Sequence, residues 1–247
     1  RKAVLPVAGL GTRVLPGTKT TPKELLNVVD RPILSYIVEE AREAAIEHIV
    51  FVTGRAKQAI EDYFDHQIEL EAQLEAKGKT EILAAMNAEL ARPGEMSFTR
   101  QMQPKGLGHA VLRTKTHVGQ EPFAVLLGDD LIDETEHLLE DMIAARGRHG
   151  GSVVALMEVP ADQVNLYGCA ATEGEPDADG VVRITGLVEK PDPADAPSNL
   201  AIIGRYVLDP SIFDVLEETP PGRGGEIQLT DALEERATAM LGKAGGL

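Results

Sequence analysis

The stretch "KAVLPVAGLGTRVLPGTKTTPKELL" (residues 2–26) joins an apolar run to a glycine-rich turn, which an arginine and two lysines follow. The apolar run is short and ends at a glycine, as buried strands commonly do. Where a strand feeds such a turn, the missing side chains let backbone N–H groups approach an anion. The stretch therefore predicts an α/β protein whose first strand ends in a phosphate-binding loop.

The loop does not follow either of the two standard nucleotide motifs. Its "GLGTRV" has the first two glycines of a dinucleotide fingerprint, but Val14 stands where the third Gly or Ala belongs. A Walker A loop needs Gly-Lys-Ser/Thr after its first glycine, and Val14 and Pro16 occupy the two possible positions. Taken alone, the loop could be a phosphate cradle or a generic turn.

Short apolar runs rich in β-branched residues recur along the chain. They occupy residues 3–8, 48–54, 123–128, 152–159, 181–189 and 201–208. Residues 33–45, directly after Pro32, carry apolar side chains at helical spacing. Strands that alternate with helices predict a Rossmann-like α/β fold, with a mixed, mainly parallel sheet flanked by helices.

Residues 56–92 break this alternation, because they are rich in Ala, Glu, Gln and Leu without a strand-like run. They predict one or two inserted helices, interrupted near Gly78. The insertion is either a solvated decoration or an oligomer contact or flap.

Residues 168–189 predict an antiparallel hairpin with Asp179-Gly180 in or near its turn, and helices are expected over 209–218 and 226–240. We expect a single domain, 1–247, with a core at 1–150 and a second part at 151–247.

The chain of 247 residues carries 40 acidic and 24 basic side chains, a formal charge of −16. Such a charge argues against a nucleic-acid or anionic-membrane surface, since both attract Lys and Arg. The longest apolar runs are far shorter than the roughly 20 residues of a membrane-spanning helix. A single cysteine, Cys169, forms no intrachain disulfide and favours a reducing compartment, the cytoplasm. The chain begins without Met and ends in "KAGGL", so we expect both ends to be incomplete.

The opening stretch resembles the signature G-x-G-T-R-x-x-P-x-T…P-K-x-L-L of the sugar-1-phosphate nucleotidyltransferases. Within that family it is most similar to the bacterial members that act on UTP and glucose 1-phosphate. The resemblance continues through "KGLGHAVL", "GDDLIDE", "EKP", "APSNLAIIGRYVL" and "GGEIQLTDAL", and so covers nearly the whole chain. It implies a nucleotide-diphospho-sugar transferase fold, with nucleotide bound by residues 1–150 and sugar by 151–247.

The reaction implied is UTP plus α-D-glucose 1-phosphate giving UDP-glucose and diphosphate, assisted by Mg²⁺. The sugar phosphate attacks the α-phosphorus, so the protein need only position the groups and neutralise their charge. By resemblance, Arg13 holds the leaving diphosphate and Lys23 contacts the phosphates, while Lys19 is left open. The expected backbone cradle consists of Ala8, Gly9, Leu10, Gly11 and Thr12.

Asp129 follows the apolar run 123–128, at the end of a strand where α/β sheets bind ligands. By resemblance it holds Mg²⁺, which prefers oxygen ligands. Asp130 is its neighbour on an extended segment, where successive side chains point in opposite directions. We therefore do not expect Asp130 to be a second ligand.

The segment "RQMQPKGLGHA" is expected to bind the base. By resemblance, Gln101 and Gly106 contact the pyrimidine, since a glutamine amide can both donate to and accept from uracil. Gln103 is the competing candidate. The mechanism needs no general base, so His109 is expected to be structural or a neighbour of the phosphates.

The sugar side is assigned by resemblance alone. Gly168 is expected to let the hexose lie against the backbone, Glu189 to accept hydrogen bonds from its hydroxyls, and Lys190 to neutralise the sugar phosphate. Asn199 and Gly204 are expected to line the same site.

The chain departs from the family pattern at three places. Asn27 and Gly128 stand where relatives commonly have Pro, and an Asp-x-Gly element expected after the last helix is absent up to Leu247. A missing C-terminal segment is therefore expected.

The resemblance also implies a homodimer or homotetramer. Three alternatives stay open: a sister enzyme using dTTP or another nucleotide, a non-catalytic nucleotide-sugar-binding paralogue, and an NAD-linked Rossmann enzyme, which Val14 disfavours.

Overall fold

The opening apolar run forms β1 (Lys2–Pro6), the strand from which the glycine-rich loop emerges. In this computed structural model the described part is residues 1–244, without the side chains of 134 and 237–244. β1 lies in the middle of an eight-stranded sheet with the order β5-β4-β1-β6-β10-β8-β9, in which β7 also pairs with β10. The other strands are β4 (His48–Thr53), β5 (Met96–Arg100), β6 (Phe123–Leu126), β7 (Val153–Glu158), β8 (Gly168–Glu173), β9 (Arg183–Glu189) and β10 (Leu200–Leu208).

The sheet changes direction at β10. Strands β5, β4, β1 and β6 run parallel, whereas β10 pairs antiparallel with β6, β7 and β8. β8 and β9 form an antiparallel hairpin in which Gly168 is paired with Glu189. The predicted mixed α/β fold is confirmed, and so is the predicted hairpin.

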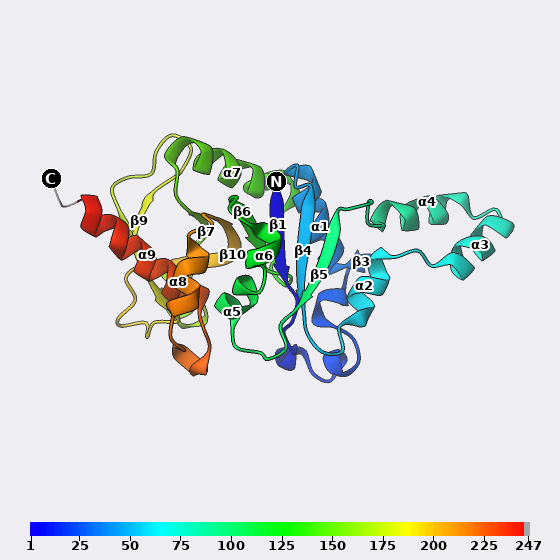
Figure 1. The fold of residues 1–247 in the computed structure, drawn as a ribbon, viewed down its shortest axis with the longest axis horizontal. Coiled ribbons are helices and arrows are strands. Elements are labelled where there is room, and N and C mark those ends of the chain that lie inside the picture. Colours follow the sequence, from blue (N-terminus) through cyan, green and yellow to red (C-terminus); the bar gives the residue numbers. More distant parts are fainter. Residues whose placement is uncertain (245–247) are drawn as a thin grey trace.

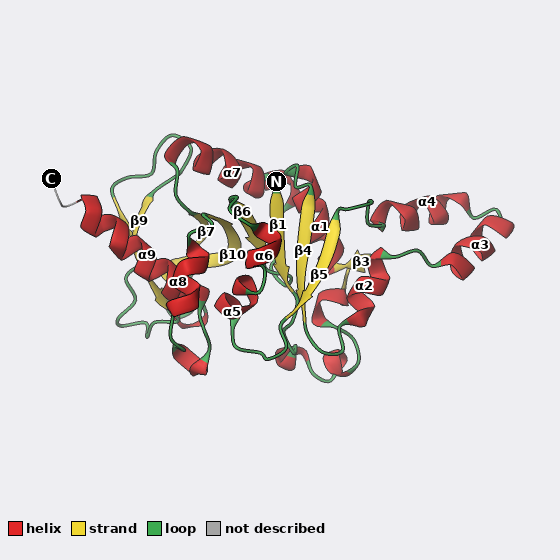
Figure 2. Ribbon diagram, viewed as in Figure 1, coloured by secondary structure: helices red, strands yellow, loops and turns green. Residues whose placement is uncertain are grey.

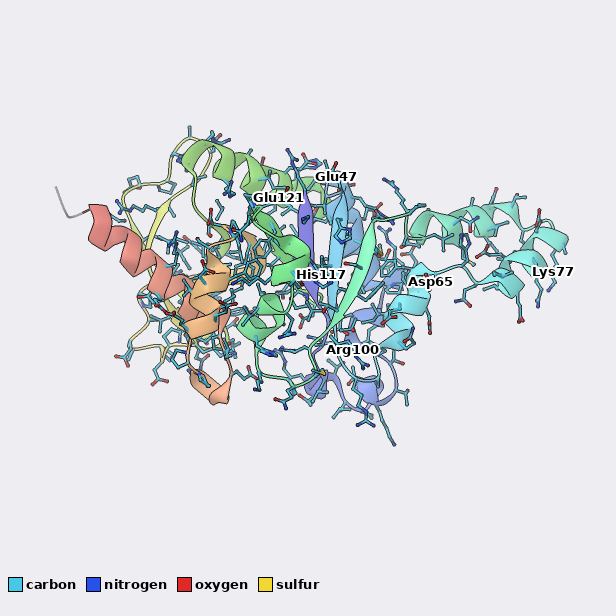
Figure 3. The ribbon with its side chains drawn as sticks, viewed as in Figure 1. Glu47, Asp65, Lys77, Arg100, His117 and Glu121 are labelled. Carbon is cyan, nitrogen blue, oxygen red and sulfur yellow. The ribbon has the colours of Figure 1, made fainter. Side chains whose placement is uncertain are left out.

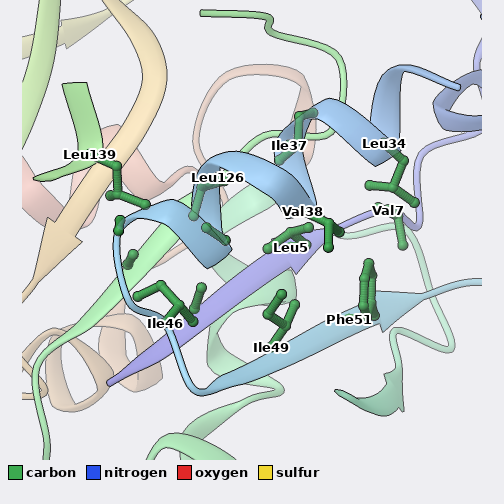
Figure 4. Close-up of a cluster of buried hydrophobic side chains, with 14 of the residues drawn as sticks. Leu5, Val7, Leu34, Ile37, Val38, Ile46, Ile49, Phe51, Leu126 and Leu139 are labelled. Carbon is green, nitrogen blue, oxygen red and sulfur yellow. The ribbon is translucent and has the colours of Figure 1, made fainter. Parts of the chain in front are cut away.

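Helices cover both faces of this sheet (Figures 1 and 2). On one face, α1 (Ile33–Glu43) packs Leu34, Ile37 and Val38 against Leu5 and Phe51, as Figure 4 shows. Helix α7 (Leu138–His149) contributes to the same cluster.

The opposite face carries Val4, Val50 and Val125, because successive strand residues point to opposite sides of a sheet. The helices packed there are α5 (Leu107–Leu112), α8 (Ile212–Glu218) and α9 (Leu229–Ala244), and α6 (Lys115–Val118) adds Val118. The sheet is therefore buried on both sides, as a parallel sheet requires.

The 56–92 insertion forms three helices rather than one or two. α2 (Gln58–Phe64) packs Ile60 and Phe64 into the core. Within the described residues, α3 (Ile68–Ala76) and α4 (Thr80–Glu89) bury none of their side chains. They project from the body as an arm whose tip carries Lys77 (Figure 3), next to the predicted break at Gly78.

One predicted helix is shorter in the structure, and one strand of the structure was not predicted. The helix after Pro32 ends at Glu43, earlier than its pattern suggests, because Ala45 has a left-handed backbone (φ 56°) and β4 begins at His48. β5 went unpredicted because "MSFTR" lacks an apolar run. The remaining short elements are β2 (Asn27–Val28), β3 (Arg31–Pro32) and six 3₁₀ turns, η1 (Thr12–Val14), η2 (Gly17–Lys19), η3 (Lys23–Leu25), η4 (Glu134–Glu136), η5 (Val164–Leu166) and η6 (Arg223–Gly225).

None of the helices found in residues 1–244 combines the length and the apolar character needed to cross a membrane.

Candidate active site

The glycine-rich loop and Asp129 lie at the same edge of the sheet. The loop follows β1, Asp129 follows β6, and these strands are parallel neighbours. Lys23 Nζ donates to Asp129 Oδ2 at 2.5 Å, and Arg13 Nη2 lies 3.9 Å from the same oxygen. The structure thus brings together the two cations and the carboxylate that the sequence singled out.

The loop owes its shape to close packing around Gly11. Gly11 has a left-handed backbone (φ 65°), and a Cβ there would lie 3.1 Å from Thr18 Cγ2. Thr18 Oγ1 donates to Gly11 O at 2.7 Å and so ties the loop to the next turn. Of the predicted cradle residues, Ala8 and Gly11 are half-buried, and the exposed ones are Gly9, Leu10 and Thr12.

Lys23 lies between the glycine-rich loop and a buried pair of charged residues. Glu24 is fully buried and accepts a 2.7 Å hydrogen bond from Lys57 Nζ. Burial raises the pKa of Glu24, although Lys57 opposes this effect. The side chain of the adjacent Lys23 runs toward the loop, with its Cε 3.6 Å from where a Cβ on Gly9 would lie.

The space beside this buried pair is also narrow at Gly128. A Cβ on Gly128 would lie 3.1 Å from Glu24 Cγ and 3.3 Å from Val7 Cγ1. Glu24 and Lys57 could not be predicted from the sequence, because their spacing does not show that the two charged side chains meet in the interior.

The side chain of Asp130 lies against Gly204. A Cβ added to Gly204 would overlap Asp130 Oδ2, so Gly204 (φ 72°) is the residue that makes room for this carboxylate. Burial, followed by the charge of Asp129, raises the pKa of Asp130. The structure therefore places Gly204, which the sequence assigned to the sugar, directly against Asp130.

A buried arginine holds the loop that carries Asp129 and Asp130. Arg205 is 0% exposed and donates to the carbonyls of Asp130 (2.7 Å), Gly204 (3.2 Å) and Leu127 (3.4 Å). Its charge is balanced by Glu40 of α1, with Nη2 and Oε2 2.8 Å apart. Sequence analysis did not find this anchor, because the partners are 165 residues apart in the chain.

The predicted base-binding residues are adjacent. Gln101 follows β5 and is 8% exposed; its Nε2 donates to Gly106 O at 2.9 Å and lies 2.9 Å from His109 Nδ1. Gly106 (φ 98°) begins α5, and a Cβ there would lie 2.7 Å from Ile227 O. Gln103, the competing candidate, is exposed.

A second group of residues forms around Glu189 at the end of β9. Glu189 Oε2 accepts from Thr230 Oγ1 at 2.7 Å, and Oε1 lies 3.1 Å from Lys190 Nζ. A Cβ on Gly168 would lie 3.2 Å from Glu189 Oε2, so the missing side chain makes room for this carboxylate beside the strand. Asn199 is exposed, and its carbonyl accepts from Val159 N at 3.0 Å.

The turn before α9 connects the two groups. Arg223 Nη1 donates to Lys190 O, next to Glu189. Ile227 N donates to Lys105 O at 2.7 Å, and Gly108 N donates to Ile227 O at 2.9 Å, near Gln101 and Gly106. Sequence analysis missed Thr230 and Arg223, although both fall in or beside the family-like "GGEIQLTDAL".

The residues around Asp129 fit a metal that is only partly held by protein. No group of three or more His, Cys, Asp or Glu in the described part of the chain is arranged to bind a metal. Mg²⁺ commonly takes one or two carboxylates and completes its shell with water and substrate phosphates. Asp129, beside two cations suited to phosphate, matches that smaller donor set.

Comparison with known proteins identifies the family. The nucleotidyl transferase family model matches residues 2–243. The UTP–glucose-1-phosphate uridylyltransferase of Streptococcus pneumoniae serotype 4 is 50% identical over 238 residues, which are 95% of this chain and 79% of that protein. A putative UTP–glucose-1-phosphate uridylyltransferase of Methanocaldococcus jannaschii is 49% identical over 233 residues, 94% of this chain and 81% of its own length.

Solved structures agree with these relatives. A UDP-glucose pyrophosphorylase complexed with UDP-glucose has a TM-score of 0.83 and 44% identity, covering 97% of this chain and 87% of that one. The UTP-bound enzyme from Acinetobacter baumannii has a TM-score of 0.87 and 44% identity, covering 98% and 82%. The chain therefore belongs to the nucleotidyl transferase family, alongside the UTP–glucose-1-phosphate uridylyltransferases.

Proposed function

We propose that this protein transfers the uridylyl group of UTP to α-D-glucose 1-phosphate, forming UDP-glucose and releasing diphosphate. The observation that carries the proposal is the convergence of Arg13, Lys23 and Asp129 at the end of β1 and β6. Relatives of the same name share half of their residues with this chain, and similar structures hold UTP or UDP-glucose.

The nucleotide side of the site is suited to hold a triphosphate while one bond breaks. An oxygen of the sugar phosphate attacks the α-phosphorus, and the bond from that phosphorus to the diphosphate oxygen breaks. Arg13 is 90% exposed at its side chain and free to turn its planar guanidinium toward the leaving diphosphate. Lys23, held by its stem under Gly9, supplies a fixed positive charge beside the phosphates.

The sugar side supplies a carboxylate and a third cation. Glu189 is positioned by Thr230, which leaves its remaining lone pairs to accept from sugar hydroxyls. Lys190 would exchange its contact with Glu189 for the phosphate of glucose 1-phosphate. Its charge would then bring the attacking oxygen close to the triphosphate despite their mutual repulsion.

We assign Mg²⁺ to Asp129, with charge neutralisation on the phosphates as its contribution when bound. Without substrate, Lys23 and Arg13 compensate this carboxylate. Arg13 and Lys23 would therefore neutralise Asp129 in the free protein and the phosphates when substrate is bound.

The base contact favours uracil over cytosine. Both N–H groups of Gln101 face protein acceptors, which leaves Oε1 to accept a hydrogen bond from N3–H of a base. Uracil and thymine both carry that hydrogen, whereas cytosine does not, so Gln101 alone does not separate UTP from dTTP. This is the observation that keeps dTTP as a second candidate.

Diphosphate release with glucose 1-phosphate, measured for UTP, dTTP, ATP, GTP and CTP, tests the proposal. We expect the highest kcat/KM with UTP. A preference for any other nucleotide would contradict the assignment. Calorimetric binding of UDP-glucose without turnover would instead identify a non-catalytic paralogue. The oligomeric state and the cytoplasmic location stay predictions of the sequence.

A further inference from the structure

Gln101 has its amide nitrogen fixed between two acceptors. One N–H points to Gly106 O at 2.9 Å, and this carbonyl favours the nitrogen over the oxygen at that end of the amide. The other N–H points to His109 Nδ1, also at 2.9 Å. Within the described residues, no protein donor is bound to Gln101 Oε1.

His109 accepts this hydrogen bond only in one form. Because Gln101 Nε2 is a donor, Nδ1 of His109 must carry no hydrogen, so the neutral ring has its proton on Nε2. Burial, followed by the charges of Arg113 and Lys105, lowers the pKa of His109, which favours the neutral ring. Since an amide is planar, Oε1 turns away from both acceptors.

We propose that His109 is a positioning residue that sets base selectivity, by occupying the second N–H of Gln101 so that the amide presents only an acceptor to the base. This inference deepens the proposed function and rests on it. His109 need not touch the nucleotide, which fits its place on α5 behind Gln101.

The chemistry of the bases gives the expected direction of selectivity. Uracil offers a hydrogen at N3, which Oε1 can accept. Cytosine offers an unprotonated N3, and a complex with it would set two acceptors against each other. Without His109 only one acceptor holds the Gln101 nitrogen, so the amide can turn and offer an N–H to cytosine N3. Removal of the imidazole acceptor should therefore relax the choice between UTP and CTP.

Two variants separate the acceptor from the volume of the side chain. His109→Leu fills similar space without an acceptor, whereas Asn in His109→Asn can place its Oδ1 where Nδ1 lies. We expect the ratio of kcat/KM for UTP to that for CTP to fall about tenfold in His109→Leu, the equivalent of one hydrogen bond. His109→Asn should keep the wild-type ratio within about twofold, since its acceptor preserves the same bond.

Two outcomes would overturn the inference when the wild type prefers UTP. In one, His109→Leu keeps the wild-type ratio and loses turnover with both nucleotides alike. In the other, the ratio of kcat/KM for UTP to that for CTP falls as far in His109→Asn as in His109→Leu. A wild type without a preference for UTP would contradict the proposed function instead.

The tautomer of His109 provides a second test, which needs no substrate and no measurement of activity. Long-range ¹H–¹⁵N spectra of the wild-type protein distinguish a ring protonated at Nε2 from one protonated at Nδ1. We expect the Nε2–H form for His109, whose signals are identified by their absence in His109→Asn. A ring protonated at Nδ1 would overturn the inference, whatever the kinetics show.

Discussion

Lys190 has a left-handed backbone (φ 48°) although it carries a long side chain. Such a conformation costs on the order of 1–3 kcal/mol and is often found at functional sites. Arg223 donates to Lys190 O, and Lys190 N donates to Tyr167 O at 2.9 Å, so both backbone groups of this residue are held. The held backbone sets the direction of the Lys190 side chain, whose ammonium group lies beside the carboxylate of Glu189.

Replacement of this lysine should act on the sugar phosphate more than on the fold. We expect Lys190→Ala to lower kcat/KM for glucose 1-phosphate by about a hundredfold, because a charge-assisted contact to phosphate is lost. The thermal midpoint should change little, since the side chain is 44% exposed. Steady-state kinetics with varied glucose 1-phosphate measures the effect.

The matched control is Lys115→Ala, which removes a half-buried lysine paired with Asp214 and Glu217. It should retain wild-type kinetics. Equal losses in the two variants would contradict the assignment of Lys190 to the sugar phosphate.

At this scale, the sequence identifies residues whose role follows from type and motif. Arg13, Lys23 and Asp129 were chosen in that way, and the structure places them together. Thr230, Arg205 and Glu24 were not found, because their importance comes from burial and from partners far away in the chain. The hydrogen-bonding role of His109 depends on its tautomer, which residue type alone does not determine.

At the scale of elements, β10 and α1 jointly fix the loop after β6. Arg205 of β10 reaches three carbonyls around this loop and pairs with Glu40 of α1. Two elements from opposite ends of the sequence therefore decide where Asp129 lies. The anchor is part of the interior, since Arg205 is fully buried while Glu40 is 20% exposed at its side chain.

Disruption of this anchor should destabilise the protein. Arg205→Met leaves Glu40 without its partner and three carbonyls without a donor, so we expect the free energy of unfolding to fall by about 3–5 kcal/mol. Urea denaturation measures this change. Arg148→Met, which breaks the exposed pair of Arg148 with Asp179, should cost less than about 1 kcal/mol. Similar losses in both variants would show that Arg205 is not an anchor.

Strands with a strong apolar pattern were predicted from the sequence, whereas a strand that forms mainly through pairing with its neighbour was not. The buried runs at β1, β4 and β6 are apolar and β-branched, and their strands were predicted. β5 was missed because its residues are only partly buried and mixed in character. Its pairing with β4 creates the strand, and its end places Gln101.

At the scale of the whole molecule, a strongly acidic chain keeps basic side chains at the candidate site. The formal charge is −16, yet Arg13, Lys23 and Lys190 occur in the two groups of site residues. The turn before α9 joins these groups through hydrogen bonds to both Lys105 and Lys190. The family resemblance predicted both groups, but their connection required the structure. The arm of α3 and α4 lies apart from this arrangement (Figure 1).

The central claim is that uridylyl transfer takes place where Asp129 faces Arg13 and Lys23. Asp129→Asn keeps the size of the side chain and removes the charge that would hold Mg²⁺. Asp133→Asn is the matched control, because this nearby carboxylate is exposed and accepts from the backbone N–H and the hydroxyl of Thr135.

The most direct test is Mg²⁺-dependent diphosphate release from UTP and glucose 1-phosphate by these two variants. We predict that kcat/KM falls by about a thousandfold in Asp129→Asn, at an unchanged thermal midpoint, and stays near the wild-type value in Asp133→Asn. Near-normal turnover by Asp129→Asn would contradict the account.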